Sequence, residues 1–242
     1  MKILAKVKYL GTSYHGWQKQ NNADSVQEII ENKLSQILNE EVTIYGSGRT
    51  DAGVHALAQT FHFIINKEVD LDRLLYSVNM ILPRDIEILS FEVVDESFHA
   101  RYSAKKKHYQ YQIYLGGKDP FYEGRVYFFP YPFDLELFKS ALTKFVGKHD
   151  FKDFTSKEED EDSFVREIYE IAVNKKDSVV TIYLYGNGFM RYMIRFLIGT
   201  ALQIATGKED ISFIDRHLDQ ENREIVSYKV PGEGLYLAEV IY

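Results

Sequence analysis

The chain has 242 residues, 45% of them hydrophobic, which is enough to bury a sizeable core, and it lacks cysteine, which excludes disulfides, thiolate metal sites and thiol nucleophiles. No stretch approaches the roughly 20 apolar residues of a membrane span, and the N-terminal residues do not resemble a signal peptide, so we expect a cytoplasmic protein. The formal net charge of -7 argues mildly against a nucleic-acid partner, but binding depends on the local field, and basic residues cluster at 105–108.

Strands and helices alternate along the first half of the chain. Alternating polar and apolar residues predict a strand over 2–9. Ser25, with Glu28 three residues later, forms a capping box that predicts an amphipathic helix. The remaining patterns predict strands at 42–45 and 57–65, a helix at 71–80 with Asp70 as its N-cap, and strands at 86–94 and 108–115.

The second half repeats this mixture. Its patterns predict a helix at 135–145 capped by Asp134, strands at 165–173 and 179–185, a helix from about 189 to 206, a short helix, and a strand at 234–242. Such interleaving favours an α+β fold with a large, mainly antiparallel sheet that is covered by helices on one face.

We expect two similar halves that form one continuous catalytic unit. The N-terminal half, residues 1–115, carries the glycine-rich segment described next, and residues 116–242 complete the cleft. The acidic run at 158–162 is typical of a solvated surface loop.

The most unusual segment is a glycine-rich loop at 46–53, between two predicted strands. It holds Arg49 and Asp51 two residues apart but matches neither the phosphate-binding loop nor the dinucleotide fingerprint. Two interpretations stay open on these residues alone. The segment is either a tight turn held by an Asp side chain, or a site in which Arg49 faces a polyanion and Asp51 a reacting base.

A family resemblance favours the second interpretation. The sequence GRTDAGVHA at 48–56 resembles the signature of the TruA family of tRNA pseudouridine synthases. Further motifs similar to those of the family follow its order from end to end of the chain: YLGT at 9–12, GWQ at 16–18, LPRDI at 82–86, FHAR at 98–101, KHYQY at 107–111, GKHDF at 147–151, NGFM at 187–190, MIR at 193–195 and GLYL at 234–237. The chain is thereby identified as a member, which implies a pseudouridine-synthase-like fold.

The resemblance implies a catalytic set. Asp51 corresponds to the aspartate that acts covalently on the target nucleotide, by attack on the base or by abstraction of a ribose proton. Tyr109 corresponds to the tyrosine that stacks on the uracil and helps to remove its C5 proton. Arg195 corresponds to the arginine that pairs with the aspartate and keeps it ionised. Neither route consumes a cofactor or needs a metal.

The resemblance also implies RNA contacts. Arg49 corresponds to the residue that fills the stack when the target base leaves it, a task that suits a planar guanidinium. Arg101, Lys105 and Lys107 are candidates for phosphate contacts. The family acts as a homodimer on tRNA, in the anticodon stem-loop at about positions 38 to 40.

Three alternatives remain. The first is a non-catalytic RNA-binding or RNA-folding protein on the same scaffold. A second is a glycosidase acting on a free nucleoside or sugar, although such enzymes use two carboxylates and only Asp51 lies in a suitable loop. The third is a paralogue within the family that modifies another tRNA position or another RNA.

Overall fold

The computed structural model describes residues 1–21, 23–156, 163–219 and 221–242, so the acidic run at 158–162 lies outside the described residues. The chain forms two compact units, a first unit of Met1–Lys105 with Tyr236–Tyr242 and a second unit of Lys106–Leu235. The predicted halves, 1–115 and 116–242, were defined by their contributions to one catalytic cleft. That division stays a prediction.

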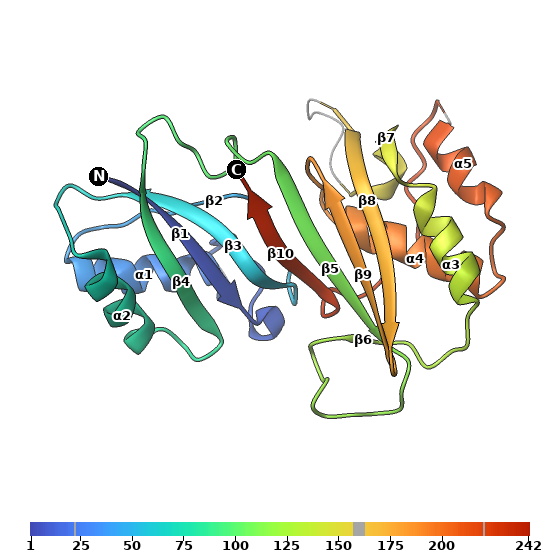
Figure 1. The fold of residues 1–242 in the computed structure, drawn as a ribbon, viewed down its shortest axis with the longest axis horizontal. Coiled ribbons are helices and arrows are strands. Elements are labelled where there is room, and N and C mark those ends of the chain that lie inside the picture. Colours follow the sequence, from blue (N-terminus) through green and yellow to red (C-terminus); the bar gives the residue numbers. More distant parts are fainter. Residues whose placement is uncertain (22, 157–162, 220) are drawn as a thin grey trace. The chain divides into compact units, whose positions relative to one another are not determined.

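The first unit contains a mainly antiparallel sheet and two α-helices (Figure 1). Its strand order is β4-β1-β3-β10, β2 also pairs with β3, and the β3–β10 pair is parallel. In chain order its elements are β1 (Lys2–Tyr9), the 3-10 helix η1 (Gly11–Ser13), α1 (Val26–Leu38), β2 (Tyr45–Gly46), β3 (His55–Ile64), α2 (Leu71–Ile81), β4 (Ile86–Val94) and β10 (Leu235–Ile241), which enters this unit at Tyr236.

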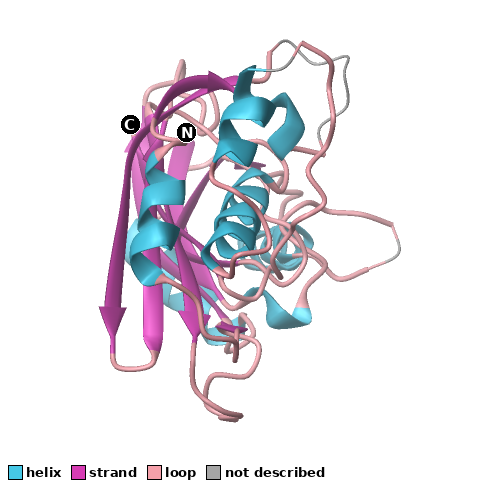
Figure 2. Ribbon diagram, turned by 90° about the vertical axis from the view of Figure 1, so that its right-hand side faces the viewer, coloured by secondary structure: helices cyan, strands magenta, loops and turns pink. Residues whose placement is uncertain are grey.

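The second unit has a sheet of order β5-β9-β8-β7, with the short strand β6 paired in parallel to β5. Helices α3, α4 and α5 lie on one side of these strands (Figure 2). In chain order its elements are β5 (Lys106–Tyr114), β6 (Tyr127–Phe128), α3 (Leu135–Thr143), β7 (Gly147–Asp150), the 3-10 helix η2 (Lys152–Phe154), β8 (Val165–Lys176), β9 (Val179–Gly186), α4 (Met193–Ala205) and α5 (Ser212–Asp219). The predicted α+β fold with a large, mainly antiparallel sheet is confirmed.

Capping signals in the sequence predicted the starts of α1, α2 and α3 correctly, whereas α3 ends at Thr143, before the predicted end at 145. The Ser25 hydroxyl accepts a hydrogen bond from the Glu28 N–H at 3.3 Å, as the capping box predicts. Asp70 and Asp134 likewise accept from the first turns of α2 and α3. These caps satisfy backbone N–H groups that have no partner within the helix.

The strand predicted at 42–45 is wrong apart from its last residue. Val42 and Ile44 are buried, as alternation suggests, but side chains of α1 bind their backbones. The Val42 N–H donates to the Ser35 hydroxyl at 2.9 Å, and the Ile44 N–H donates to the Glu31 carboxylate at 3.0 Å. A buried loop whose N–H groups are satisfied in this way needs no neighbouring strand.

Helix α4 begins at Met193, later than the predicted start near 189. Tyr192 causes the difference, because its φ of 61° lies in the left-handed region and breaks the helical path. The two short strands β6 and β7 were not predicted, since neither has enough residues to show an alternating pattern.

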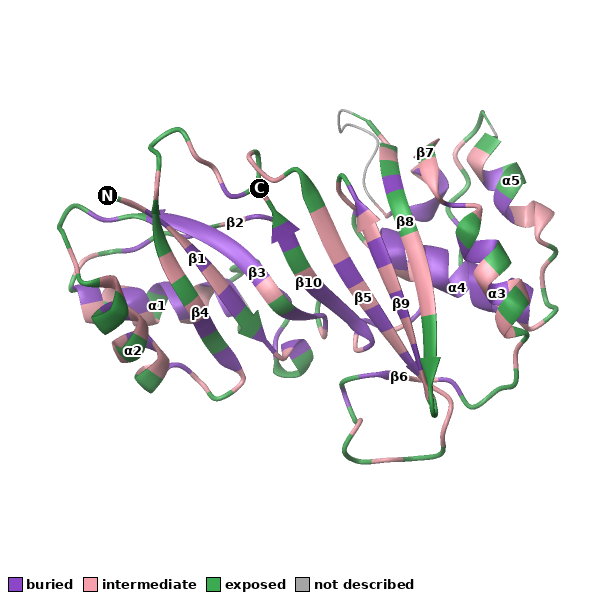
Figure 3. Cartoon of the chain, in the orientation of Figure 1, coloured by how far each residue is buried: buried purple, intermediate pink, exposed green. Residues whose placement is uncertain are grey.

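Strand β3 is buried along most of its length (Figure 3). The glycine-rich loop at 47–54, called the candidate loop, runs into the N-terminal end of β3, so this buried strand fixes one end of the loop. Across the described ranges, no helix combines the length and apolar character needed to cross a membrane.

Candidate active site

The loop at 47–54 joins β2 to β3 and contains the candidate nucleophile. Asp51 is half-buried. Thr50 before it and Val54 after it are buried, whereas Ala52 is exposed. The Val54 N–H donates to the Asp51 carbonyl at 3.1 Å and closes a turn. Within this turn Gly53 has a φ of 74°, a conformation that glycine adopts without strain.

The segment after β1 packs directly against this loop. The Trp17 N–H donates to the Thr50 carbonyl at 3.0 Å, and the Gly53 N–H donates to the Tyr14 carbonyl at 3.4 Å. Gly16 has a φ of 95°, and a Cβ at this position would lie 2.6 Å from the Thr50 carbonyl oxygen. The two backbones approach so closely that only glycine fits at position 16.

Side chains from the end of β1 and from the segment after it hold Thr50, the residue before Asp51. The hydroxyl groups of Tyr9 and Thr50 share a buried hydrogen bond of 2.8 Å. The Trp17 indole is 2% exposed and lies 6.0 Å, centroid to centroid, from the Tyr9 ring. The backbone on the N-terminal side of Asp51 is therefore held by both main-chain and side-chain contacts.

Both ends of the loop are anchored. At its start, the Ser47 hydroxyl donates to the Gln59 amide oxygen at 2.7 Å, and the Gln59 amide donates to the Gly48 carbonyl at 3.0 Å. At its end, the fully buried His55 ring accepts a hydrogen bond through Nδ1 from the Gly11 N–H at 2.8 Å. Such anchoring limits movement of the loop and keeps Asp51 in one position.

Arg49 is exposed at the side of this loop. Its Nε donates to the Gln18 amide oxygen at 3.0 Å, so the GWQ motif contacts the arginine as well as the loop backbone. The planar guanidinium thus lies on the surface in the same loop as Asp51, where it can reach a polyanion.

Arg101 and Lys105 lie on the connection from β4 to β5, residues 95–105, and both are exposed. The Arg101 guanidinium carbon lies 5.7 Å from the centroid of the Tyr102 ring. The Lys105 N–H donates to the Ile241 carbonyl at 2.8 Å, which ties the end of the connection to β10.

Lys107, Tyr109 and Arg195 belong to the second unit. Lys107 is half-buried on β5, and Tyr109 on the same strand is 8% exposed, with its ring edge-to-face against Phe189 at 5.3 Å. In the first turn of α4, the Arg195 Nε donates to the Val230 carbonyl at 2.8 Å, and its guanidinium lies 4.8 Å from the Tyr192 ring centroid. The Arg195 side chain is therefore oriented within its own unit.

The predicted site residues fall into two groups. Arg49 and Asp51 share one loop of the first unit, whereas Tyr109 and Arg195 lie on β5 and α4 of the second. The pairing of Asp51 with Arg195, and the approach of Tyr109 to the same substrate, stay predictions.

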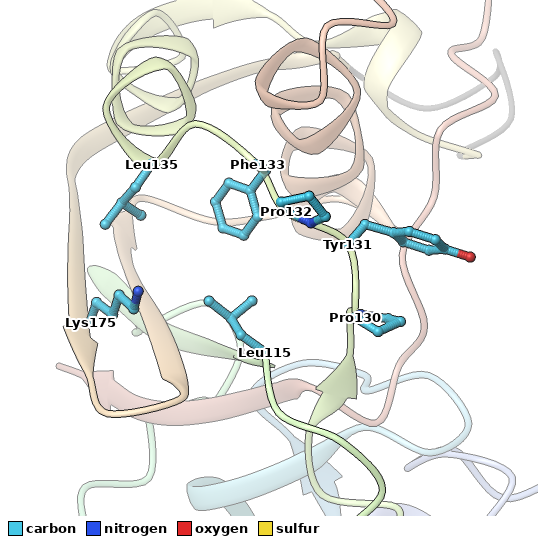
Figure 4. Close-up of a pocket in the computed structure, with 7 residues that line it drawn as sticks. All are labelled: Leu115, Pro130, Tyr131, Pro132, Phe133, Leu135 and Lys175. Carbon is cyan, nitrogen blue, oxygen red and sulfur yellow. The ribbon is translucent and has the colours of Figure 1, made fainter.

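A separate cavity of about 360 Å³ lies in the second unit (Figure 4). It contains none of the predicted site residues, and its lining consists of Leu115, Pro130, Tyr131, Pro132, Phe133, Leu135 and Lys175. Within the parts of the chain that the structure describes, no group of three or more His, Cys, Asp or Glu side chains is placed to hold a metal ion.

A pair of histidines in the first unit, His62 on β3 and His99 on the connection from β4 to β5, was missed by the sequence analysis. The His62 Nδ1 accepts a hydrogen bond from the Ala100 N–H at 3.2 Å, and the His62 ring lies edge-to-face with His99 at 4.6 Å. Burial, with smaller contributions from His99 and Lys2, lowers the pKa of His62 from 6.5 to about 4. Ala100 and His99 belong to the FHAR motif at 98–101, which the sequence analysis had noted. Their partner His62 lies 38 residues before Ala100 in sequence, so the motif alone could not reveal the contact.

This pKa predicts that the protein loses stability in mild acid. Below about pH 6.5 the unfolded chain binds a proton at His62 whereas the folded protein does not, so the free energy of unfolding falls as the pH approaches 4. The expected contribution is on the order of 2 kcal/mol. Urea denaturation at several pH values should show a shallower acid dependence for His62→Asn, which keeps an acceptor, than for the wild type. Equal slopes would contradict the prediction.

Sequence comparisons give the relatives of this chain. The sequence model of a family described as tRNA pseudouridine synthase matches residues 5–103 and 141–242. The chain is 38% identical to tRNA pseudouridine synthase A of Acetivibrio thermocellus, over 98% of this chain and 97% of that protein. It is 36% identical to the protein of the same name from Thermoanaerobacter pseudethanolicus, over 99% of both chains. The corresponding Staphylococcus aureus protein is 35% identical, over 99% of this chain and 91% of that protein.

One solved structure similar to this chain is a chain from the crystal structure of a Cbf5-Nop10-Gar1 complex, with 12% identity and a TM-score of 0.43. The match covers 97% of this chain and 48% of that chain.

Proposed function

Because this chain belongs to the tRNA pseudouridine synthase A family and is therefore an isomerase, we propose that it acts in the anticodon stem-loop of tRNA with the Asp51 carboxylate as its nucleophile. The single observation that carries the assignment of Asp51 is its loop. The half-buried Asp51 follows the exposed Arg49 by two positions, in a loop that residues distant in sequence hold through hydrogen bonds.

The proposed reaction rearranges the target nucleoside without any net change in composition. Asp51 acts as an ionised carboxylate, either by attacking the nucleotide or by removing a ribose proton. The bond between ribose C1′ and uracil N1 breaks, the base turns, and C1′ joins C5. The C5 proton leaves to solvent, and N1 gains a proton. A carboxylate with few solvent contacts and one oriented cation is well suited to this task.

Tyr109 and Arg195 are assigned the supporting roles. The fixed edge-to-face contact with Phe189 orients the Tyr109 ring, which we assign to stacking on the uracil and to removal of the C5 proton. Hydrogen bonding to the Val230 carbonyl orients the Arg195 guanidinium, which we assign to ion pairing with Asp51. Such an ion pair favours the charged form of the carboxylate.

The remaining assignments concern the RNA. Arg49 replaces the extruded base in the stack, and Arg101, Lys105 and Lys107 contact phosphates. The enzyme works as a cytoplasmic homodimer that holds one tRNA across both subunits, and the target uridines lie at about positions 38 to 40. Two facing basic surfaces would offset the formal net charge of -7.

Tritium release tests this proposal. The wild-type protein is incubated with tRNA labelled at uridine C5, without added metal or cofactor, and the modified positions are then mapped. We expect release from tRNA at the anticodon stem-loop and none from free [5-³H]uridine. Tight tRNA binding without release would instead favour a non-catalytic RNA-binding protein, and release from free uridine would favour a nucleoside-acting enzyme.

Tyr9→Phe tests the support of the catalytic loop. The change removes the hydroxyl that bonds Thr50, next to Asp51, while the buried ring remains. We expect kcat to fall about tenfold with little change in KM, because the lost hydrogen bond positions the nucleophile and does not hold the substrate. Steady-state kinetics on tRNA measure both constants. A rise in KM at constant kcat would contradict this role.

A further inference from the structure

A cluster of aromatic rings lies partly exposed on the first unit. The Tyr45 ring stacks on His62 with centroids 5.1 Å apart and an interplanar angle of 22°. His99 lies 4.6 Å from His62 and 4.4 Å from Tyr102. Tyr45 is 49% exposed and Tyr102 is 77% exposed, so the two outer rings of this cluster face solvent. We call Tyr45, His99 and Tyr102, with His62 beneath them, the aromatic cluster.

The backbone beneath the aromatic cluster is held in one conformation, although it belongs to a surface connection. The His99 carbonyl accepts from the Ser103 N–H at 2.9 Å, and the His99 Nδ1 accepts from the Arg101 N–H at 3.1 Å. The Ala100 carbonyl accepts from the Tyr242 hydroxyl at 2.9 Å. Rings held in this way lose little conformational entropy when a ligand binds.

Three cationic side chains belong to the aromatic cluster's own connection or contact its backbone. Arg101 lies over the Tyr102 ring, Lys105 is exposed on the same connection, and the Lys2 ammonium donates to the Phe98 carbonyl at 2.9 Å. Two carboxylates, Asp95 and the exposed Glu96, lie at the start of the connection, and Asp95 accepts hydrogen bonds from the Ser97 N–H and hydroxyl at 2.8 and 2.6 Å. Exposed rings interleaved with cations are the combination by which proteins hold single-stranded nucleic acid.

The aromatic cluster is also adjacent to the candidate loop in the chain. Tyr45 belongs to β2, and the loop that carries Arg49 and Asp51 begins two residues later. The six residues from Tyr45 to Asp51 limit the distance between their Cα atoms to about 22 Å, a span of a few nucleotides.

We propose that the aromatic cluster is a stacking site for an unpaired base of the RNA substrate, a base other than the target uridine. The proposal rests on the proposed function, since it takes RNA as the ligand. Any of the four bases can stack at this site, because every base presents a π-face. The site therefore contributes affinity and helps to set the register of the RNA without selecting a base.

Binding of tRNA by Tyr102→Ala tests the proposal. All variants carry Asp51→Asn as well, so that no turnover disturbs the equilibrium, and filter binding gives Kd for an unmodified tRNA. Loss of one stacked base predicts a Kd about tenfold higher. Tyr102→Phe keeps the ring and should bind within about twofold of its parent, and Tyr45→Ala should weaken binding as Tyr102→Ala does. The matched control is Tyr76→Ala, which removes another exposed tyrosine, on α2, and should leave Kd unchanged.

The salt dependence of Kd distinguishes stacking from charge. Tyr102→Ala should leave the slope of log Kd against log salt unchanged, whereas Lys105→Ala should lower it by about one unit if that lysine contacts a phosphate. An unchanged Kd for Tyr102→Ala would overturn the stacking site while leaving the proposed function intact. The same holds if sedimentation shows that Tyr102→Ala changes the oligomeric state of the protein, because the ring would then support subunit contact and not base stacking. Failure of the Asp51→Asn parent and the wild type to bind any tRNA would overturn the proposed function itself.

Discussion

Asp51→Asn is expected to slow tritium release from C5-labelled tRNA by at least about 10³-fold, while tRNA affinity stays near that of the wild type. The amide has almost the same shape as the carboxylate but carries no charge, so it can neither attack carbon nor abstract a proton at a useful rate. The loop should keep its conformation, because the hydrogen bonds that anchor it involve the Asp51 backbone and neighbouring residues. Single-turnover kinetics with excess enzyme isolate this chemical step.

Asp177→Asn provides the control for this substitution. Asp177 is exposed between β8 and β9 with a φ of 53°, a conformation that asparagine adopts as readily as aspartate. The control should retain wild-type activity and melting temperature. Retention of more than about a tenth of wild-type activity by Asp51→Asn would exclude the carboxylate as the nucleophile, since loss of a nucleophile costs orders of magnitude.

Gly16→Ala is expected to have the second largest effect, on both stability and activity. The added methyl group would lie 2.6 Å from the Thr50 carbonyl oxygen, at a backbone φ of 95° that alanine tolerates poorly. We expect a loss of about 2–4 kcal/mol in unfolding free energy and a melting temperature lower by about 5–15 °C. Activity should fall by about 10²-fold, because the loop must move and a displacement of about 1 Å at a nucleophile has that cost.

Gly117→Ala is the matched control, because a Cβ at position 117 meets no atom within 4 Å. It should change neither melting temperature nor activity. Thermal denaturation followed by circular dichroism, together with the tritium assay at a temperature where both variants are folded, separates the two effects. Wild-type activity in a folded Gly16→Ala protein would show that the contact between residues 16 and 50 does not position Asp51.

The sequence by itself determined the fold class, most of the elements and the family. Alternation over 2–9 and 86–94 coincides with β1 and β4, and the caps at Ser25, Asp70 and Asp134 lie where the helices begin. These features depend on side-chain periodicity and on hydrogen bonds between residues three apart, which short windows of sequence contain. Asp51 was identified as the candidate nucleophile by the family motif at 48–56, and not by the periodicity of polar and apolar residues.

Only the tertiary structure decided how residues distant in sequence meet. The hydrogen bond between Tyr9 and Thr50, the approach of Gly16 to the candidate loop and the contact of His62 with Ala100 each join segments more than thirty residues apart. Alternation alone could not show that α1 side chains satisfy the backbone at Val42 and Ile44. The physical reason is that such contacts depend on where the chain returns in space, which periodicity does not encode.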